Sequence, residues 1–126
     1  MDATIYRDVI TCEASANISD VAKIIRDHRV RHVYIIEHGK LVGVLGGIDI
    51  NNKIVALGKD PNAATARDVM NPVESATKDQ RLEYAYAIMR NFNTFTCPVV
   101  DEQKQLLGYY KFADVCEAIN EHVKVK

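Results

Sequence analysis

The sequence predicts an α+β fold made of two β-α-β-β-α repeats. Two segments of the chain match at a constant offset, which grows by one where the second copy has an extra residue in a turn. Each copy combines an amphipathic helical pattern with β-rich runs that flank a polar turn. A match kept over about 40 residues indicates duplication of one structural unit. The matched landmarks are Glu37 with Asp101, Gly43 with Gly108, and Asp49 with Asp114.

The elements of the first copy follow from its apolar pattern. A short β-rich run comes first, and an amphipathic helix follows with Asn17 as a suitable N-cap. Two further β-rich runs predict a hairpin, and a second helix ends before Gly58, a good C′ residue. The expected elements cover residues 9–12, 18–29, 33–36, 41–45 and 48–57 of a first repeat spanning residues 1–58. The helical stripe consists of Ile18, Val21, Ala22 and Ile25.

The second copy shows the same order after a polar linker over residues 59–66. Its first helix carries an apolar stripe, and Asp79 is expected to cap that helix. The expected elements cover residues 73–76, 82–92, 97–100, 106–110 and 112–122 of a second repeat spanning residues 67–126. The helical stripe consists of Leu82, Ala85, Met89 and Phe92.

Composition argues against several classes of protein. The formal net charge is −1, and basic and acidic residues balance in both halves, unlike in a general nucleic-acid binder. No apolar run approaches the roughly 18–20 residues that span a bilayer, and the charged start of the chain is not a signal peptide. Three widely spaced cysteines fit reduced thiols in a cytoplasmic protein, and no C-x-x-C pair or histidine cluster predicts a metal site.

Two hairpin motifs and one lead-in motif carry a resemblance to a known family. Each hairpin contains a Gly and is followed by an Asp at the start of the closing helix. The motifs are Val33-Tyr34-Ile35-Ile36 with Leu41-Val42-Gly43-Val44, Cys97-Pro98-Val99-Val100-Asp101 with Leu106-Leu107-Gly108-Tyr109, and Arg67-Asp68-Val69-Met70. In their doubled order and spacing, these motifs resemble the CBS-domain family over nearly the whole chain.

The resemblance implies both a fold and a function. Two repeats would pack about a pseudo-two-fold axis, with two clefts between them, and homodimers would be frequent. The family binds adenosine-containing ligands in such clefts, among them AMP, ADP, ATP, S-adenosylmethionine and cyclic dinucleotides. The usual result is control of an attached domain or of a partner protein.

The resemblance also assigns the ribose and phosphate contacts. In the family, the pattern G-h-h-[ST]-x-x-D ends in an Asp that accepts hydrogen bonds from the ribose hydroxyls, and Asp49 and Asp114 match it. The Ser/Thr that would contact phosphate is absent, because Gly46 and Lys111 stand in its place. Lys111 would supply a positive charge instead, and Gly46 would let backbone N–H groups approach a phosphate. The alternative interpretation is that both aspartates only cap their helices.

The remaining expected contacts come from the strands. In relatives, residues before the middle strand reach the phosphates, main-chain groups of the opening strand read the adenine edge, and an apolar side chain stacks on the ring. The corresponding residues are Thr11, Cys12, Arg31, His32, Val44, Ser75, Ala76, Thr96, Pro98 and Tyr109. Alternatively, Arg31 is an ordinary solvated charge, and the side chains of Thr11 and Ser75 only pack.

Together, these features predict a regulatory module that senses an adenosine-containing nucleotide or a ligand like S-adenosylmethionine. A ligand-free module for dimerisation or protein interaction is the alternative, which the missing Ser/Thr residues favour. An enzyme with a cofactor is not expected, because no nucleophile, base or metal constellation stands out. If only one site is used, the site around Asp49 is expected, since that copy adds Arg31, His32 and Gly46.

Overall fold

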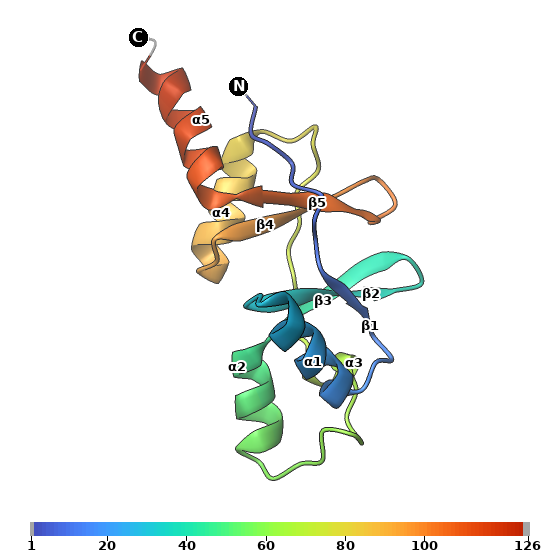
Figure 1. The fold of residues 1–126 in the computed structure, drawn as a ribbon. Helices are drawn as coiled ribbons and strands as arrows, with labels where there is room; N and C mark the ends of the chain where they lie inside the picture. Colours follow the sequence, from blue (N-terminus) through green and yellow to red (C-terminus); the bar gives the residue numbers. More distant parts are fainter. Residues whose placement is uncertain (1, 125–126) are drawn as a thin grey trace. The chain divides into compact units, whose positions relative to one another are not determined.

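The computed structural model describes the backbone of residues 2–124 and the side chains of residues 2–120. The chain forms two compact units (Figure 1). The repeat-one unit is Ile10–Val73, and the repeat-two unit combines the residues up to Val9 with those from Glu74 onward. The compact units therefore divide the chain differently from the sequence repeats, because each unit contains the first residues of the other repeat.

The repeat-one unit is a three-stranded sheet with helices on one face. In the sheet order β1-β2-β3, the first pair is parallel and the second antiparallel. The elements are β1 (Thr11–Glu13), α1 (Ile18–His28), β2 (His32–Glu37), β3 (Lys40–Gly46), α2 (Gly47–Ile50), the π-helix η1 (Asn51–Val55) and α3 (Ala66–Val69). The predicted order β-α-β-β-α is confirmed for this copy.

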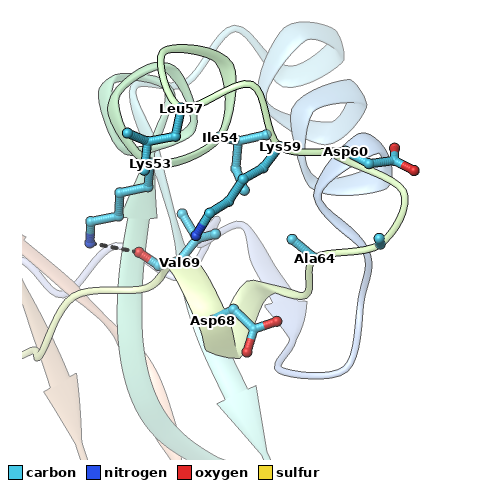
Figure 2. A pocket seen from close by; sticks show the side chains of 9 residues that line it. Lys53, Ile54, Leu57, Lys59, Asp60, Ala64, Asp68 and Val69 are labelled. Atoms are coloured by element: carbon cyan, nitrogen blue, oxygen red, sulfur yellow. Dashed lines mark hydrogen bonds between the residues drawn. The ribbon is translucent and has the colours of Figure 1, made fainter.

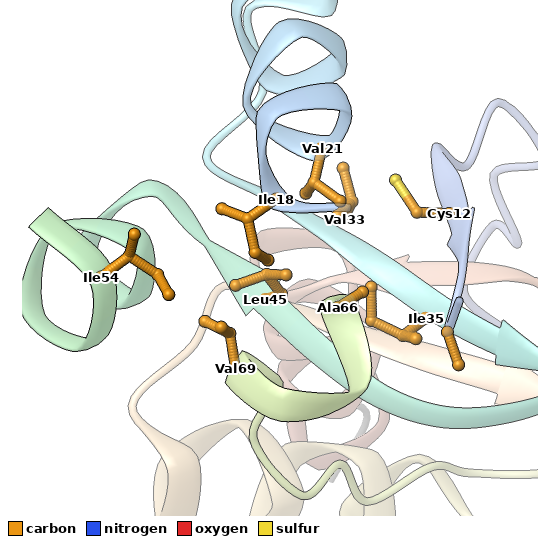
Figure 3. Packing of buried hydrophobic residues seen from close by; sticks show 10 residues of the cluster. Cys12, Ile18, Val21, Val33, Ile35, Leu45, Ile54, Ala66 and Val69 are labelled. Carbon is orange, nitrogen blue, oxygen red and sulfur yellow. The ribbon is translucent and has the colours of Figure 1, made fainter. Parts of the chain in front are cut away.

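Helix α1 forms as its sequence predicts. The Asn17 side chain accepts a hydrogen bond of 2.9 Å from the Asp20 backbone N–H, so Asn17 is the N-cap. Ile18 and Val21 of the stripe are fully buried against the sheet, and Ile25 is partly buried. Figure 3 shows Ile18 and Val21 meeting Val33 and Leu45 from β2 and β3, with α3 completing the core.

The closing helix of repeat one differs from the single helix expected over residues 48–57. Only one turn of α2 is α-helical, and the chain then continues as a π-helix in which the Ala56 N–H donates to the Asn51 carbonyl at 2.8 Å. Ile54 of this segment is buried in the core, and Ile50 packs against it while partly exposed. Three large apolar side chains stay exposed: Ile48 at 72%, Val55 at 66% and Leu57 at 62%.

The repeat-two unit is an antiparallel pair of strands covered by two helices (Figure 1). Its elements are α4 (Leu82–Phe92), β4 (Thr96–Val100), β5 (Leu106–Lys111) and α5 (Phe112–Lys124). The strand predicted over residues 73–76 is wrong, because only Ala76 forms a bridge, parallel to Val99. That bridge is the counterpart of the pairing of Cys12 with Ile35 in β1 and β2, at the same offset that relates Glu37 to Asp101.

Two details of α4 also correct the prediction. Arg81 is the N-cap and makes no side-chain capping bond, so Asp79 does not cap the helix; instead, the Gln80 side chain accepts from the Thr77 N–H. Phe92 is 47% exposed, because it is the last helical residue and lies a turn beyond Met89, where the core ends. Ile88 is buried in the cluster instead.

Each repeat starts with a lead-in segment, which contains Tyr6 in repeat one and Asn71 in repeat two. The two lead-in segments pair with the middle of β5 and of β3 in matching ways. Asn71 and Val44 exchange two backbone hydrogen bonds of 2.8 and 3.1 Å. Tyr6 and Tyr109 exchange two of 2.9 Å. Tyr109 and Val44 are related by the offset of Gly43 and Gly108, so Tyr6 and Asn71 occupy equivalent places beside β5 and β3. The duplication thus extends to these lead-in segments, shifted by one residue from the offset that relates Glu37 to Asp101.

Close approach of the lead-in backbone explains the glycines matched between the hairpins. A Cβ on Gly43 would lie 2.5 Å from the Met70 sulfur, and a Cβ on Gly108 would overlap the Tyr6 carbonyl oxygen. At Gly108 the overlap is with backbone, so only a residue without a side chain lets Tyr6 pair at this distance. At Gly43 the nearest atoms belong to the flexible Met70 side chain, and the Asn71 carbonyl oxygen lies 3.0 Å from the added Cβ, so the requirement is strict at Gly108 and weaker at Gly43.

We expect Gly108→Ala to destabilise the protein by about 1–3 kcal/mol, since the added methyl group has to push the Tyr6 backbone away from β5. The free energy of unfolding in urea measures this effect. Gly47→Ala is the control, because no heavy atom lies within 4 Å of a Cβ added there. Equal stability of the two variants would contradict the steric explanation.

Candidate functional site

Asp49 holds the start of α2 and the second lead-in segment together. Its Oδ2 accepts a hydrogen bond of 2.8 Å from the Gly46 N–H, which is the capping role considered as the alternative from the sequence. Its Oδ1 accepts a bond of 2.8 Å from the Asn71 side-chain amide. Asp49 is therefore an internal anchor, whatever else it binds.

Asn71 extends this anchor into a polar network that the sequence patterns do not reveal. The Asn71 Oδ1 accepts a hydrogen bond of 2.8 Å from Lys53 Nζ, which also donates to the Val69 carbonyl at 2.9 Å. The network thus links α2, η1 and the lead-in segment through side chains that are all half-buried. The one available signal was the position of Asn71, directly after Arg67-Asp68-Val69-Met70.

The Arg31 and Gly46 backbones meet beside Asp49. His32 pairs with Gly46 across β2 and β3, and the Gly47 N–H donates to the Arg31 carbonyl at 3.4 Å. A Cβ on Gly46 would lie 2.8 Å from that carbonyl, so the missing side chain is required by packing. The Arg31 side chain is exposed.

His32 is half-buried, and its ring lies edge-on to Tyr34 with 5.2 Å between the centroids. Burial lowers the pKa of the His32 imidazole, because desolvation disfavours the charged ring. At neutral pH this histidine is therefore a neutral hydrogen-bonding group, and any positive charge at this end of the hairpin comes from Arg31.

Strand register groups most repeat-one candidates on one face of the sheet. Thr11, Tyr34 and Val44 are neighbours across the three strands, and His32 and Gly46 lie two residues further along on the same face. The opposite face carries the core under α1. Cys12 is the exception, because its buried side chain belongs to that core. Its neighbours Ile10 and Ala14 both bond to β2, and the register directs the Cys12 main-chain groups to β2 as well.

In the repeat-two unit, three candidates converge on a residue that was not predicted. The Tyr6 hydroxyl donates a hydrogen bond of 2.6 Å to Asp114 Oδ2. The Tyr6 ring stacks on Tyr109 with 5.5 Å between centroids and an interplanar angle of 28°. Lys111 Nζ lies 4.1 Å from the centroid of the same ring, a cation–π contact. Tyr109 in turn donates to Asp8 at 3.0 Å.

The other repeat-two candidates divide between the two faces of the sheet. Thr96 pairs with Lys111, and Pro98 pairs with Tyr109, so these four residues share one face. Ala76 lies in the core on the other face, and its N–H and carbonyl both bond to β4, to the Pro98 carbonyl and the Val100 N–H at 2.9 Å. Its main chain is thus fully engaged, and Ser75 beside it is half-buried.

A cavity of about 600 Å³ lies elsewhere in the repeat-one unit, and none of the candidate ligand-binding residues lines it (Figure 2). Lys53 forms part of its wall, with the amine directed to the Val69 carbonyl as Figure 2 shows. The lining residues are Lys53, Ile54, Leu57, Lys59, Asp60, Ala63, Ala64, Asp68 and Val69.

The described residues form neither a reactive thiol site nor a cluster of metal ligands. The three cysteines are free, and burial raises the pKa of the Cys97 thiol to about 12. Within the described residues, no three His, Cys, Asp or Glu side chains gather as metal ligands. No helix in residues 2–124 is long and apolar enough to cross a membrane.

The family model for the CBS domain matches residues 4–56 and 66–121. The chain belongs to the CBS domain family. Solved structures with a similar fold include Hypoxic Response Protein I with two coordinated zinc ions, at a TM-score of 0.83, 23% identity and coverage of 94% of this chain and 99% of that one. The CBS pair of protein MJ0100, solved with 5′-methylthioadenosine and S-adenosylmethionine, has a TM-score of 0.71, 28% identity and coverage of 91% and 94%. The family and fold expectations are thus confirmed.

Curated relatives place the same module in different contexts. An uncharacterized protein of Methanopyrus kandleri is 29% identical over 88% of this chain and 58% of its own length. L-aspartate semialdehyde sulfurtransferase of Methanocaldococcus jannaschii is 28% identical over 89% of this chain but only 22% of its own length. CBS domain-containing protein YhcV of Bacillus subtilis is 26% identical over 94% of this chain and 82% of its own length.

The hydrogen bond between Tyr6 and Asp114 can be followed through the titration of the Tyr6 phenol. The hydrogen bond to Asp114 raises the pKa of Tyr6, because losing the phenol proton puts a second negative charge beside the carboxylate. A raised folded-state pKa means that the contact stabilises the unit below the ordinary value of 10.0 and is lost as pH rises through the folded value.

We expect Asp114→Asn to lower the pKa of Tyr6, measured by ¹³C NMR of ζ-labelled tyrosine and assigned with Tyr6→Phe. Asp8→Asn is the matched control, because Asp8 is bonded to Tyr109 and should mainly lower the pKa of Tyr109. A Tyr6 titration unchanged by Asp114→Asn would show that the bond is absent in solution.

Proposed function

We propose that the chain is a regulatory module that binds an adenosine-containing ligand at the repeat-one site. The observation that carries this proposal is the grouping of Arg31, His32 and Asp49 around Gly46, at one end of the β2–β3 hairpin. The ligand class is supported by the 28% identical CBS pair of protein MJ0100, whose structure contains 5′-methylthioadenosine and S-adenosylmethionine.

Asp49 retains the capacity to bind ribose. Its two oxygens accept one internal hydrogen bond each, from Gly46 and Asn71. A carboxylate offers about four acceptor positions, so two ribose hydroxyls still find partners. Bonds to an ionised acceptor are stronger than neutral ones, and the internal bonds hold the carboxylate in a fixed orientation.

The charge beside Asp49 favours a phosphorylated ligand. Arg31 presents an exposed guanidinium, whose planar fork of N–H groups fits phosphate oxygens. His32 adds a hydrogen bond without a charge, because burial lowers its pKa. The sulfonium of S-adenosylmethionine would meet the same guanidinium repulsively. We therefore rank AMP, ADP and ATP ahead of S-adenosylmethionine.

A regulatory role follows from how the ligand would share Asp49 with the lead-in segment. A ligand that binds Asp49 more tightly when Asn71 is held differently shifts the population of that segment. Regulation then acts on an attached domain or a partner protein. This proposal agrees with the relatives, of which the chain spans 58% and 22% in the first two cases.

We expect calorimetric titration to show binding of AMP or ATP with a dissociation constant below about 1 mM. Asp49→Ala should abolish the binding, and Arg31→Ala should weaken ATP by about tenfold while changing 5′-methylthioadenosine far less. Two matched variants serve as controls. Asn71→Ala removes the internal bond to Asp49 but keeps the carboxylate, and Arg26→Ala removes another exposed arginine of the same unit.

Absence of binding to AMP, ATP, S-adenosylmethionine and 5′-methylthioadenosine would reject the proposed function. Loss of ATP binding in Asn71→Ala as complete as in Asp49→Ala would indicate that the network, and not ribose contact, is what Asp49 provides.

The second candidate function is a dimerisation or protein-interaction module that needs no ligand. The exposed side chains of Ile48, Val55 and Leu57 favour it, because large apolar residues grouped on one helical segment are typical of contact surfaces. A homodimer formed through this segment is compatible with ligand binding, so the two functions differ in whether a ligand controls the module.

We expect the double substitution Ile48→Ser, Val55→Ser to convert a dimer into a monomer, measured by light scattering during size-exclusion chromatography. Phe95→Ser is the control, because Phe95 is equally exposed, at 70%, but lies in the repeat-two unit. A dimer unaffected by the double substitution would exclude this segment as the interface.

A further inference from the structure

We propose that Tyr6 is a built-in occupant of the repeat-two ligand site, and that it restricts adenosine-ligand binding to repeat one. The inference rests on the proposed function, because it concerns which of two duplicated sites that function uses. It also goes beyond it, since it assigns the choice to one side chain from the lead-in segment.

The contacts of Tyr6 match those that a ligand would need. Asp114, the counterpart of the ribose-binding Asp49, accepts the phenol hydroxyl at 2.6 Å. Tyr109, the expected stacking partner of adenine, stacks on the Tyr6 ring at 5.5 Å. Lys111, the expected phosphate ligand, directs its ammonium to the same ring at 4.1 Å. A hydroxyl on a flat ring thus engages all three groups that are expected to hold a ribose, a base and a phosphate.

Backbone pairing keeps Tyr6 in this position. Its N–H and carbonyl both bond to Tyr109 at 2.9 Å, and the carbonyl lies so close to Gly108 that no side chain fits between them. The next residue adds a bond from the Arg7 guanidinium to the Leu107 carbonyl at 3.3 Å. The lead-in segment is therefore tied to β5 on both sides of the ring, and an incoming ligand has to displace the ring without help from a mobile backbone.

Repeat one contains the matching position with a different side chain. Asn71, the counterpart of Tyr6 by its pairing with the equivalent strand, exchanges the same two backbone bonds with Val44 and makes the same kind of hydrogen bond to Asp49. An asparagine has no ring to stack on the strand. The duplicated geometry therefore separates two roles: both residues anchor the Asp, but only Tyr6 also covers Tyr109 and Lys111.

The apparent affinity of the repeat-two site for a ligand is reduced by the fraction of time for which the Tyr6 ring has left the site. If the ring leaves the site for a tenth of the time, the apparent affinity for a ligand falls about tenfold. The wild-type protein should then bind one equivalent of AMP or ATP per chain, at the repeat-one site.

The decisive variant is Tyr6→Asn, which introduces the repeat-one residue at the repeat-two position. Because Asn71 makes the equivalent pairing and hydrogen bond, this variant is expected to fold, which circular dichroism and thermal unfolding verify. Titration with AMP and with ATP should show a second equivalent, bound at least about tenfold more tightly than by the wild-type repeat-two unit. Adding Asp114→Ala should remove it, and adding Asp49→Ala should leave it as the one equivalent.

Two further variants define the mechanism. Tyr6→Ala removes both the ring and the hydroxyl and should also open the site, which provides a second test if Tyr6→Asn does not fold. Tyr84→Ala is the control, because Tyr84 is an exposed tyrosine of the same unit and should leave the stoichiometry at one.

The possible outcomes separate this inference from the proposed function. Binding of one equivalent that depends on Asp49, unchanged in folded Tyr6→Asn and Tyr6→Ala, would overturn the role of Tyr6 and leave the proposed function standing. Two equivalents in the wild type, one of them lost with Asp114→Ala, would do the same. No binding of AMP or ATP by any variant would reject the proposed function and this inference together.

Discussion

The lead-in segments pair with β3 and β5 through main-chain hydrogen bonds, and much of each unit depends on that pairing. Asn71 and Tyr6 each exchange two such bonds with the middle of a hairpin strand. At β5 the exchange brings the two backbones so close that the facing residue has to be Gly108. It also carries a side chain to the carboxylate at the start of the closing helix, so one backbone constraint positions both candidate sites.

That constraint leaves the side chain of the lead-in residue free to change. Backbone bonds fix where residues 6 and 71 lie, whatever side chain they carry. In repeat one, the short amide satisfies Asp49 and connects it to Lys53. In repeat two, the phenol satisfies Asp114 and adds a ring that Tyr109 and Lys111 contact. Two copies of one fold thus place different side chains on the matching aspartate.

Sequence patterns predicted the local elements well, because helical and strand periodicity are local properties. Both hairpins and the Asn17 cap follow from residues near one another, whereas the exposure of Phe92 depends on where the core ends. The partner of Asp114 lies near the other end of the chain and escaped prediction. The repeat offset did not point to it, because the offset that relates Glu37 to Asp101 leads from Tyr6 to Met70, and only the pairing with β5 and β3 matches Tyr6 to Asn71.

The two aspartates show why a capping interpretation and a binding interpretation need not exclude each other. Asp49 caps α2 and anchors Asn71, yet a carboxylate retains acceptor positions after both bonds are made. What decides whether a ligand can use those positions is the space and charge around them. Beside Asp49, the lead-in segment contributes the small amide of Asn71, and the exposed Arg31 precedes β2. Beside Asp114, the Tyr6 ring already contacts the ammonium of Lys111. The same aspartate at the same repeat position therefore has different surroundings in the two copies, and the residue bonded to it is part of that difference.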